Sequence, residues 1–420
     1  MTTSPLLYQR FLSPSLADAR EDTPVILVCG ARQTGKTTLV QRTAQREGAP
    51  TYRTLDDATV LAAARADPRG FLESLPAPVV IDEVQHCPEL FPAIKLLVDR
   101  ERTPGRFVLT GSANVLLLPK LSESLAGRME ILTLYPLAQA EIRGGRWTVV
   151  DDLFAPVFTP ADAPAVAREE LARMLLAGGY PEPLARNRGS RREQWFGAYL
   201  TTILQRDVRD IADIADVTQL PRILSVIASR TANLLNVTEL SSNLAMPYAT
   251  LHRYLAILEA TYLVTRLPAW SGNLGARATR TPKVYLSDTG LAGQLMGLNA
   301  ERLLDSVGGG VLLGALLETF VMTELLKQAS WSQTRPALFH FRTQGRQEVD
   351  IVLERRGGEI VGIEVKAAAT VSAADFKGLN ALREATVGAR FLRGIVFYTG
   401  DVAVAFGPDL YAVPLSFLWQ

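Results

Sequence analysis

Residues 30–37 read Gly-Ala-Arg-Gln-Thr-Gly-Lys-Thr, which is a complete G-x-x-x-x-G-K-[ST] phosphate loop. The apolar run Val25–Val28 precedes the loop, and a stretch compatible with a helix follows from Lys36 to Arg46. This pattern predicts a strand-to-helix turn, where Gly-rich backbone wraps a polyphosphate and the helix N-terminus offers unpaired N–H groups. Lys36 is expected to reach the β- and γ-phosphates, and the Thr37 hydroxyl to hold Mg²⁺. The sequence therefore predicts binding of a nucleoside triphosphate.

Length and composition limit the remaining possibilities. A chain of 420 residues with 48% hydrophobic content suggests two or three domains with real cores. Because 44 Lys and Arg residues balance 43 Asp and Glu residues, any contact with nucleic acid must come from local patches. Cys29 and Cys87 are the two cysteines, which suits a reducing cytoplasm. We find no signal-peptide pattern in residues 1–12 and no apolar run near the ~20 residues that span a bilayer, so a cytoplasmic, non-membrane protein is expected.

The first 145 residues are expected to form one α/β domain with a parallel sheet. Short apolar runs alternate with helical stretches, and this alternation implies strands joined by right-handed crossovers. Ligands in such sheets bind beyond the carboxyl ends of the strands. The predicted strands are Val25–Cys29, Thr51–Leu55, Pro78–Asp82, Arg106–Thr110 and Glu130–Leu134.

Two carboxylates follow the third predicted strand. Asp82 at a strand tip can hold a Mg²⁺ shell, and the adjacent Glu83 can polarise an attacking water. After the fourth strand, Ser112 or Asn114 could touch the γ-phosphate or instead cap a helix. Arg128, just before the fifth strand, is a candidate arginine finger, in cis or across a subunit boundary, or alternatively part of a surface ion pair.

The segments GARQTGKT, VVIDEVQ, LTGSAN and LAGR, in this order, resemble an AAA-type ATPase module. More closely, they resemble a prokaryotic family in which this module is joined to a C-terminal domain of unknown function, over nearly the whole chain. The resemblance implies a Walker B pair at Asp82 and Glu83, a sensor at Ser112 or Asn114, and a finger at Arg128. The residues expected to contact the nucleotide are Gly30, Ala31, Arg32, Gln33, Thr34, Gly35, Lys36, Thr37, Thr38 and Ser112.

The middle region, residues 146–300, contains a segment that resembles a winged helix-turn-helix. Residues 220–267 predict three helices and a return strand. The first helix is expected over Leu220–Leu235, the second is capped at Asn236, and the third, a recognition helix, covers Pro247–Ala260. DNA is therefore an expected partner, although a packing module or subunit contact on the same fold is the alternative. The basic residues expected to contact phosphates are Arg266, Arg277, Arg280 and Lys283. We assign no chemistry to the helix break at residues 178–183, the polar run at residues 205–210, or the strand end at residues 285–290.

The C-terminal region, residues 301–420, contains a second candidate site on a hairpin. Two alternating runs flank the turn at residues 355–358. Centring the hairpin on Gly357 pairs Ile351 with Ile363 and Leu353 with Val361 on an apolar face. The opposite face then carries Asp350 across from Glu364, with Lys366 two residues further. A one-residue slip would move charge into the core, so the pattern fixes the register.

Two carboxylates and a lysine on one strand pair need a neutralising partner. A divalent metal held by Asp350 and Glu364, with Lys366 orienting a water or stabilising a phosphate, is one answer. The spacing resembles the PD-(D/E)xK nuclease superfamily, which implies a further acid on a preceding helix, and Glu318 fits. Val349 stands where that motif has Pro. A non-catalytic ion-pair network is the alternative, and His340 is expected to be a strand residue and not a ligand.

Together these features predict a multidomain α/β protein: a P-loop NTPase sheet, a winged-helix middle and a restriction-endonuclease-like C-terminal domain. The expected catalytic residues are Lys36, Glu83, Arg128, Glu318, Asp350, Glu364 and Lys366, with Thr37, Asp82, Asp350 and Glu364 as metal ligands. The expected cofactors are ATP and Mg²⁺, or Mn²⁺ at the second site, in a possible homo-oligomer. The leading hypothesis is an ATPase coupled to a metal-dependent, DNA-binding or DNA-cleaving domain. The alternative is a nucleotide-dependent switch with an inactive nuclease-like domain; a small-molecule kinase is weaker, because no acceptor-binding domain is evident.

Overall fold

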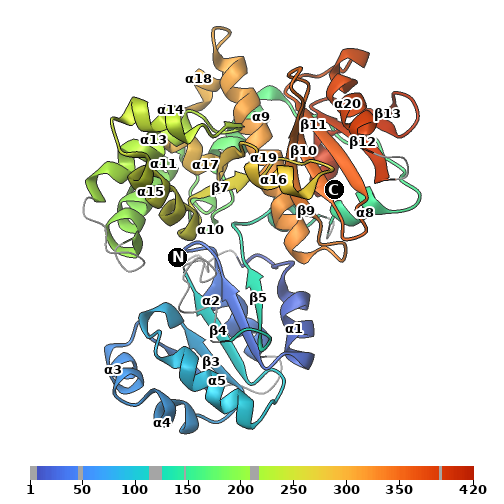
Figure 1. Ribbon diagram of the computed structural model, residues 1–420. Helices are drawn as coiled ribbons and strands as arrows, with labels where there is room; N and C mark the ends of the chain where they lie inside the picture. The colour runs from blue at the N-terminus through green and yellow to red at the C-terminus, as the bar shows by residue number, and fades with distance from the viewer. Residues whose placement is uncertain (1–6, 46–50, 113–124, 146–147, 209–216, 387–389) are drawn as a thin grey trace.

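The structure is a computed structural model that describes residues 7–45, 51–112, 125–145, 148–208, 217–386 and 390–420. Three sheets organise these residues, with five, three and six strands. The N-terminal sheet lies apart from the other two, and the helical middle region and the C-terminal sheet sit side by side above it (Figure 1).

The N-terminal domain is the predicted parallel α/β sheet, with strand order β2-β3-β4-β1-β5. Val25–Cys29 forms β1 as predicted, and the other four strands match within one residue at each end. They are β2 (Thr51–Thr54), β3 (Val79–Asp82), β4 (Phe107–Gly111) and β5 (Met129–Thr133). The covering helices are α1 (Ser13–Asp22), α2 (Lys36–Gln45), α3 (Ala58–Ala66), α4 (Pro68–Glu73) and α5 (Leu90–Arg100), and α7 (Gln139–Arg143) leads out of the domain.

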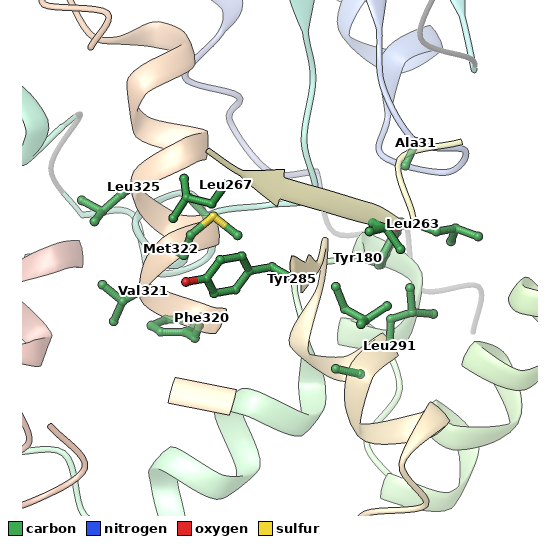
Figure 2. Packing of buried hydrophobic residues seen from close by; sticks show 14 of the residues in the cluster. Ala31, Tyr180, Leu263, Leu267, Tyr285, Leu291, Phe320, Val321, Met322 and Leu325 are labelled. Carbon is green, nitrogen blue, oxygen red and sulfur yellow. The ribbon is translucent and has the colours of Figure 1, made fainter. Parts of the chain in front are cut away.

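Residues of β1 alternate between two hydrophobic clusters, as a strand covered on both faces requires. Ile26 and Val28 belong to a cluster that continues into the middle region, whereas Val25 and Leu27 pack with α3 to α5. The larger cluster contains Ala31 of the phosphate loop together with Leu263 and Tyr285 of the middle region, which Figure 2 shows from close by. The nucleotide loop is therefore packed directly against the rest of the molecule.

The middle region consists of short helices around a three-stranded antiparallel sheet in the order β6-β8-β7. Its first helix is shorter than predicted, because residues 233–234 form strand β6 where a helix to Leu235 was expected. The Asn236 side chain accepts a 3.1 Å hydrogen bond from the Glu239 amide and so caps the next helix as predicted. The elements are α8 (Val150–Phe154), α9 (Arg168–Ala177), α10 (Pro181–Leu184), α11 (Gly189–Thr202), α13 (Leu220–Ala228), β6 (Asn233–Leu234), α14 (Val237–Leu244), α15 (Tyr248–Ala260), β7 (Val264–Leu267), α16 (Leu274–Thr279), β8 (Lys283–Leu286), α17 (Thr289–Leu295) and α18 (Ala300–Leu304).

The C-terminal domain has a mixed six-stranded sheet in the order β13-β14-β12-β11-β10-β9. The predicted hairpin register is confirmed, since Ile351 pairs with Ile363 and Leu353 with Val361. The elements are α19 (Gly309–Trp331), β9 (Ala337–Arg342), β10 (Glu348–Glu354), β11 (Ile360–Lys366), α20 (Lys377–Ala385), β12 (Phe391–Tyr398), β13 (Val404–Ala405) and β14 (Leu410–Pro414).

Helix α19 connects the three parts of the protein. It is long and apolar enough to cross a membrane, but 61% of its most apolar window is buried inside the molecule and it carries the buried charges of Glu324 and Lys327. Glu324 accepts a 2.8 Å hydrogen bond from the Gln139 amide, and Lys327 donates to the Leu137 carbonyl at 3.0 Å. These bonds identify α19 as a core helix that joins the N-terminal domain to the C-terminal sheet.

Candidate functional site

The phosphate loop lies between β1 and α2, as its sequence predicts. Gly30 has φ 148°, and a Cβ there would lie 2.1 Å from the backbone oxygen of Leu134. Only glycine fits both this conformation and this close approach. The first glycine of the motif therefore lets the loop leave β1 tightly against the end of β5.

Lys36 points into the loop. Its Nζ donates to the carbonyl oxygens of Gly30 and Ala31, both at 3.0 Å, and the residue is 4% exposed. Burial lowers the pKa of this ammonium, while the charges of Glu83 and Asp82 oppose that shift. Phosphate oxygens of a nucleotide would replace these carbonyls as acceptors of the ammonium.

Asp82 is the polar centre of the site. Its carboxylate accepts hydrogen bonds from Thr37 Oγ1 at 3.0 and 3.1 Å, from the Tyr52 hydroxyl at 2.7 Å, and from Thr110 Oγ1. The adjacent hydroxyl of Thr37 and carboxylate of Asp82 are oxygen donors of the type that Mg²⁺ prefers, so the residues present fit the ion. Mg²⁺ would supply charge neutralisation for the phosphates. Tyr52 was missed, because nothing in its sequence neighbourhood marks it as a partner of Asp82.

Glu83 has an unusual backbone. Its φ of 58° is left-handed, a strained conformation for a residue with a side chain, and its amide donates to Thr110 Oγ1 at 3.0 Å. The side-chain amide of Gln85 donates to the Glu83 carboxylate and to Ser112 Oγ, the latter at 2.9 Å. The structure thus brings the predicted Glu83 and Ser112 together through Gln85, which sequence reasoning did not single out.

Arg128 does not join this group. It precedes β5 at the end opposite the phosphate loop, because Met129 pairs with Val25, the first residue of β1. Arg128 pairs with Asp99 at 2.5 Å. The structure therefore rules against a finger acting in cis and leaves Arg128 a candidate only across a subunit boundary. Asn114, the other sensor candidate, lies outside the described residues.

The predicted acidic site of the C-terminal domain contains an unexpected cation. Nζ of Lys283, on β8 of the middle region, lies 2.8 Å from Glu318, 2.6 Å from Glu348 and 3.3 Å from Asp350. Lys283 is 2% exposed. The Tyr285 hydroxyl donates to Glu318 at 2.7 Å, and Figure 2 shows its ring directed from β8 towards α19.

Charge within this acidic cluster (Glu318, Glu348, Asp350 and Glu364) is only partly compensated. Burial disfavours the charged form of Lys283 and so acts to lower its pKa. The negative charges of its three carboxylate partners outweigh burial, and the pKa of Lys283 is raised. Burial, and next the charge of Asp350, raise the pKa of Glu318 to about 7, against the opposing effect of Lys283. Burial likewise raises the pKa of Glu364, with Asp350 adding to the shift. One buried lysine therefore holds a cluster that still favours an additional proton or cation.

The predicted strand pair keeps its charges on one face. Lys366 Nζ lies 3.2 Å from Glu364, and the Val365 amide donates to Asp350 at 3.0 Å. Within the described part of the chain, however, no three His, Cys, Asp or Glu residues are grouped so that they could hold a metal ion. In this arrangement the expected metal site is a salt-bridge network centred on Lys283.

The basic residues expected to contact nucleic acid are mostly engaged elsewhere. Arg266 forms a bidentate pair with Glu259, and Arg277 forms one with Glu354. Lys283 is inside the acidic cluster, so its assignment as a phosphate contact is wrong. His340 is a buried residue of β9 with Nε2 3.1 Å from the Thr281 carbonyl oxygen, consistent with the expected strand residue.

Sequence comparisons identify the N-terminal domain and the family. Residues 22–143 match a family model described as AAA domain, and residues 168–302 and 313–418 match two described as domains of unknown function, DUF8612 and DUF4143. The protein named uncharacterized protein Rv2008c of Mycobacterium tuberculosis is 31% identical over 411 residues, which cover 97% of this chain and 84% of that protein. This chain belongs to the same family. Its counterpart in Mycobacterium bovis, uncharacterized protein Mb2031c, matches with the same identity and coverage.

Similarity to solved structures is weak. The Walker-type ATPase of Pyrococcus abyssi is 17% identical with a TM-score of 0.41, covering 67% of this chain and 94% of that one. The RuvB Holliday junction branch migration motor of Thermotoga maritima is 19% identical with a TM-score of 0.28, covering 61% and 87%. The match of residues 22–143 to the AAA family model identifies this part of the chain as a P-loop ATPase domain of the AAA type.

Proposed function

We propose that this protein is an ATP-hydrolysing, nucleotide-dependent switch whose C-terminal nuclease-like domain does not cut in the arrangement described. Hydrolysis would use Lys36 on the β- and γ-phosphates, Thr37 and Asp82 at Mg²⁺, and Glu83 to orient the attacking water. The family match supports the ATPase part of this proposal. The silent C-terminal domain is supported by the position of Lys283.

The position of Lys283 is the main observation behind the proposal. Its ammonium gives the acidic cluster positive charge that a divalent metal would otherwise give. Its ammonium is bonded to Glu318, Glu348 and Asp350 at once. Of these, Asp350 is an expected metal ligand, and Glu318 is the further acid that the nuclease resemblance implies. A metal could enter only if the ammonium left a site where it is 2% exposed. Removing one partner of a buried ion pair costs about 3–5 kcal/mol, so this exchange is expensive within a fixed structure.

A second candidate function, metal-dependent cleavage, has its own observation in favour. Asp350, Glu364 and Lys366 lie on the predicted strand pair in the predicted register. Burial and the charge of Asp350 raise the pKa of Glu318, which favours additional positive charge at the cluster. A rearrangement that withdrew β8 would expose these residues together. Cleavage then becomes a conditional activity of the same switch.

DNA is the partner we propose for the middle region. The order α13, β6, α14, α15, β7, α16, β8 with sheet order β6-β8-β7 resembles a winged helix, apart from α16 between the last two strands. On α15, Tyr248 is 53% exposed, and its ring lies 6.1 Å from that of the exposed His252. This exposed end of α15 supports a contact with a duplex.

The proposal is tested by ATP turnover and by cleavage of single- and double-stranded DNA with Mg²⁺ or Mn²⁺, each with and without ATP. We expect the protein to hydrolyse ATP. We expect no DNA cleavage in the absence of ATP. The control for any cleavage observed is Asp350→Ala. Cleavage by the nucleotide-free wild type that Asp350→Ala abolishes would contradict the silent site, and absence of ATP turnover would contradict the switch.

A further inference from the structure

Arg32 is the third residue of the phosphate loop. It contacts residues of the middle region. Its Nη1 lies 2.7 Å from Oδ1 of Asp207, in a pair whose side chains are 20% and 8% exposed. The Arg32 carbonyl also accepts a hydrogen bond from the Tyr199 hydroxyl at 3.2 Å. Both side chain and backbone of this residue are thus bound by the same segment of chain.

That segment is the end of α11 and the single π-helical turn that follows it, Ile203–Asp207. Such turns occur mostly as local distortions of α-helices and are frequent at functional sites. Asp207 lies in the polar run at residues 205–210, to which the sequence alone assigned no chemistry. The structure assigns Asp207 to the rim of the nucleotide site.

The charges around Arg32 point to the reacting end of the nucleotide. Burial opposes its charge, but Asp207, then Glu83, then Asp56 outweigh burial and raise the pKa of the guanidinium. Arg32, like other arginines, stays charged at ordinary pH, and the charge of Glu83, the residue expected to orient the attacking water, acts on it. A γ-phosphate bound between Lys36 and Glu83 would carry its charge close to this guanidinium.

We propose that Arg32 is a cis-acting arginine that contacts the γ-phosphate, and that Asp207 is the anion that it leaves when ATP binds. Guanidinium binds phosphate in a planar, bidentate manner, and a Mg²⁺-bound triphosphate offers more acceptor oxygens than one carboxylate. When Arg32 changes its partner from Asp207 to the γ-phosphate, ATP binding releases the Ile203–Asp207 turn. This inference rests on the proposed ATP hydrolysis and names the residue through which the nucleotide is detected.

Other arginines near the domain are less suited to the role. Arg128 lies at the opposite end of the sheet. Arg10 is fixed by bonds to Glu141, to the Thr34 carbonyl and to the Tyr135 carbonyl, which make it a support of the loop. Arg32 combines a place within the loop with a partner that nucleotide could displace.

Steady-state kinetics separate catalysis from structural support. Arg32→Ala should lower kcat for ATP about 10³-fold, the effect of losing an arginine finger. Its affinity for ADP, which has no γ-phosphate, should change less than about threefold, or less than 0.7 kcal/mol. Arg32→Lys should recover part of kcat, because it keeps the charge but not the fork. Arg69→Ala, on the exposed ion pair with Glu73, is the matched control.

Two kinetic results would overturn the proposal: a kcat of Arg32→Ala within about threefold of wild type, or an equal loss of ADP affinity, which a structural role would cause. A wild type without turnover would instead contradict the proposed hydrolysis. The role of Arg32 would then be tested by equilibrium binding of ATP and ADP. The wild type should prefer ATP, and Arg32→Ala should lose this preference.

Hydrogen exchange tests the release of Asp207 directly. In Glu83→Gln, which should bind ATP without hydrolysing it, ATP but not ADP should raise amide exchange in residues 199–207. Asp207→Ala should show the raised exchange without nucleotide and bind ATP about three- to tenfold more tightly, since the competing anion is gone. Equal exchange with ATP and ADP, or weaker ATP binding by Asp207→Ala, would contradict the exchange of partners.

Discussion

The ammonium of Lys283 lies 2.8 Å from a carboxylate oxygen of Glu318, although the two residues belong to different parts of the chain. Lys283 is on the middle strand of the small sheet, and Glu318 is on the central helix of the C-terminal domain. Together with Glu348 and Asp350 they form a buried network at the place where the sequence predicts a metal. At the nucleotide site, by contrast, Thr37 and Asp82 are hydrogen-bonded to each other beside the phosphate loop. The protein thus joins a P-loop ATPase domain to a closed acidic site.

Replacing Lys36 should remove ATP turnover. Without its ammonium the loop loses the cation expected on the β- and γ-phosphates, so Lys36→Ala should lower kcat at least about 100-fold, equivalent to 2.7 kcal/mol. Phosphate release is the measurement, and Lys95→Ala, an exposed lysine on α5, is the matched control. Full turnover by Lys36→Ala would contradict the assignment of this site.

Replacing Lys283 should destabilise the fold through its carboxylate partners. Lys283→Met leaves buried acids without their cation, so the free energy of unfolding should fall by about 3–5 kcal/mol. Adding Glu318→Gln and Asp350→Asn should return much of that loss, because the remaining charge is removed. Denaturant unfolding of the single and triple variants measures both effects. A triple variant less stable than Lys283→Met would show that the charges are not the cause.

His340 should make stability depend on pH in acid. Burial, and next the charge of Lys283, lower the pKa of His340 from 6.5 to about 4. Between these values the unfolded chain binds the proton and the folded one does not, so this contribution is present above pH 6.5 and lost as pH falls towards 4. The expected loss is about 3 kcal/mol.

Unfolding free energies between pH 4 and 7 test this expectation, with His340→Gln as the comparison. Glu348 and Arg342 also act on His340, so both proteins should be measured at the same ionic strength. The wild-type curve should rise more steeply with pH than that of His340→Gln. Parallel curves would contradict a buried, neutral histidine.

The exposed end of α15 should contribute to DNA binding. Tyr248→Ala combined with His252→Ala should weaken binding to duplex DNA about tenfold at low salt, or 1.4 kcal/mol. Fluorescence anisotropy at two salt concentrations is the measurement, and Lys95→Ala on a distant helix is the control. Equal affinity of the double variant and wild type would favour the alternative, a packing module or subunit contact.

The sequence predicts local features of this protein better than contacts between its domains. The strands of the N-terminal domain and the 351–363 hairpin register follow from apolar alternation, which acts over a few residues. The approach of Lys283 to Glu318, of Asp207 to Arg32 and of Gln85 to Ser112 depends on tertiary packing.

Arg128 is a prediction from local sequence that the tertiary arrangement does not support. Its place in the LAGR motif, just before the predicted fifth strand, suggested a finger, but the direction of β5 places it at the edge of the sheet opposite the phosphate loop. The runs at residues 178–183 and 285–290 had no assigned chemistry, yet they meet in space. Gly179 donates to Asp288 at 2.7 Å, and the hydroxyls of Tyr180 and Tyr199 lie 3.1 Å apart. Long-range pairs of this kind carry no periodic signal in a single sequence.

Mn²⁺ binding to the nucleotide-free protein, measured by calorimetry on wild type, Asp350→Asn and Lys283→Met, tests the closed acidic site most directly. If Lys283 takes the place of the metal, wild type and Asp350→Asn should bind Mn²⁺ equally, and Lys283→Met should gain a site. A site present in the wild type and lost in Asp350→Asn would contradict the account.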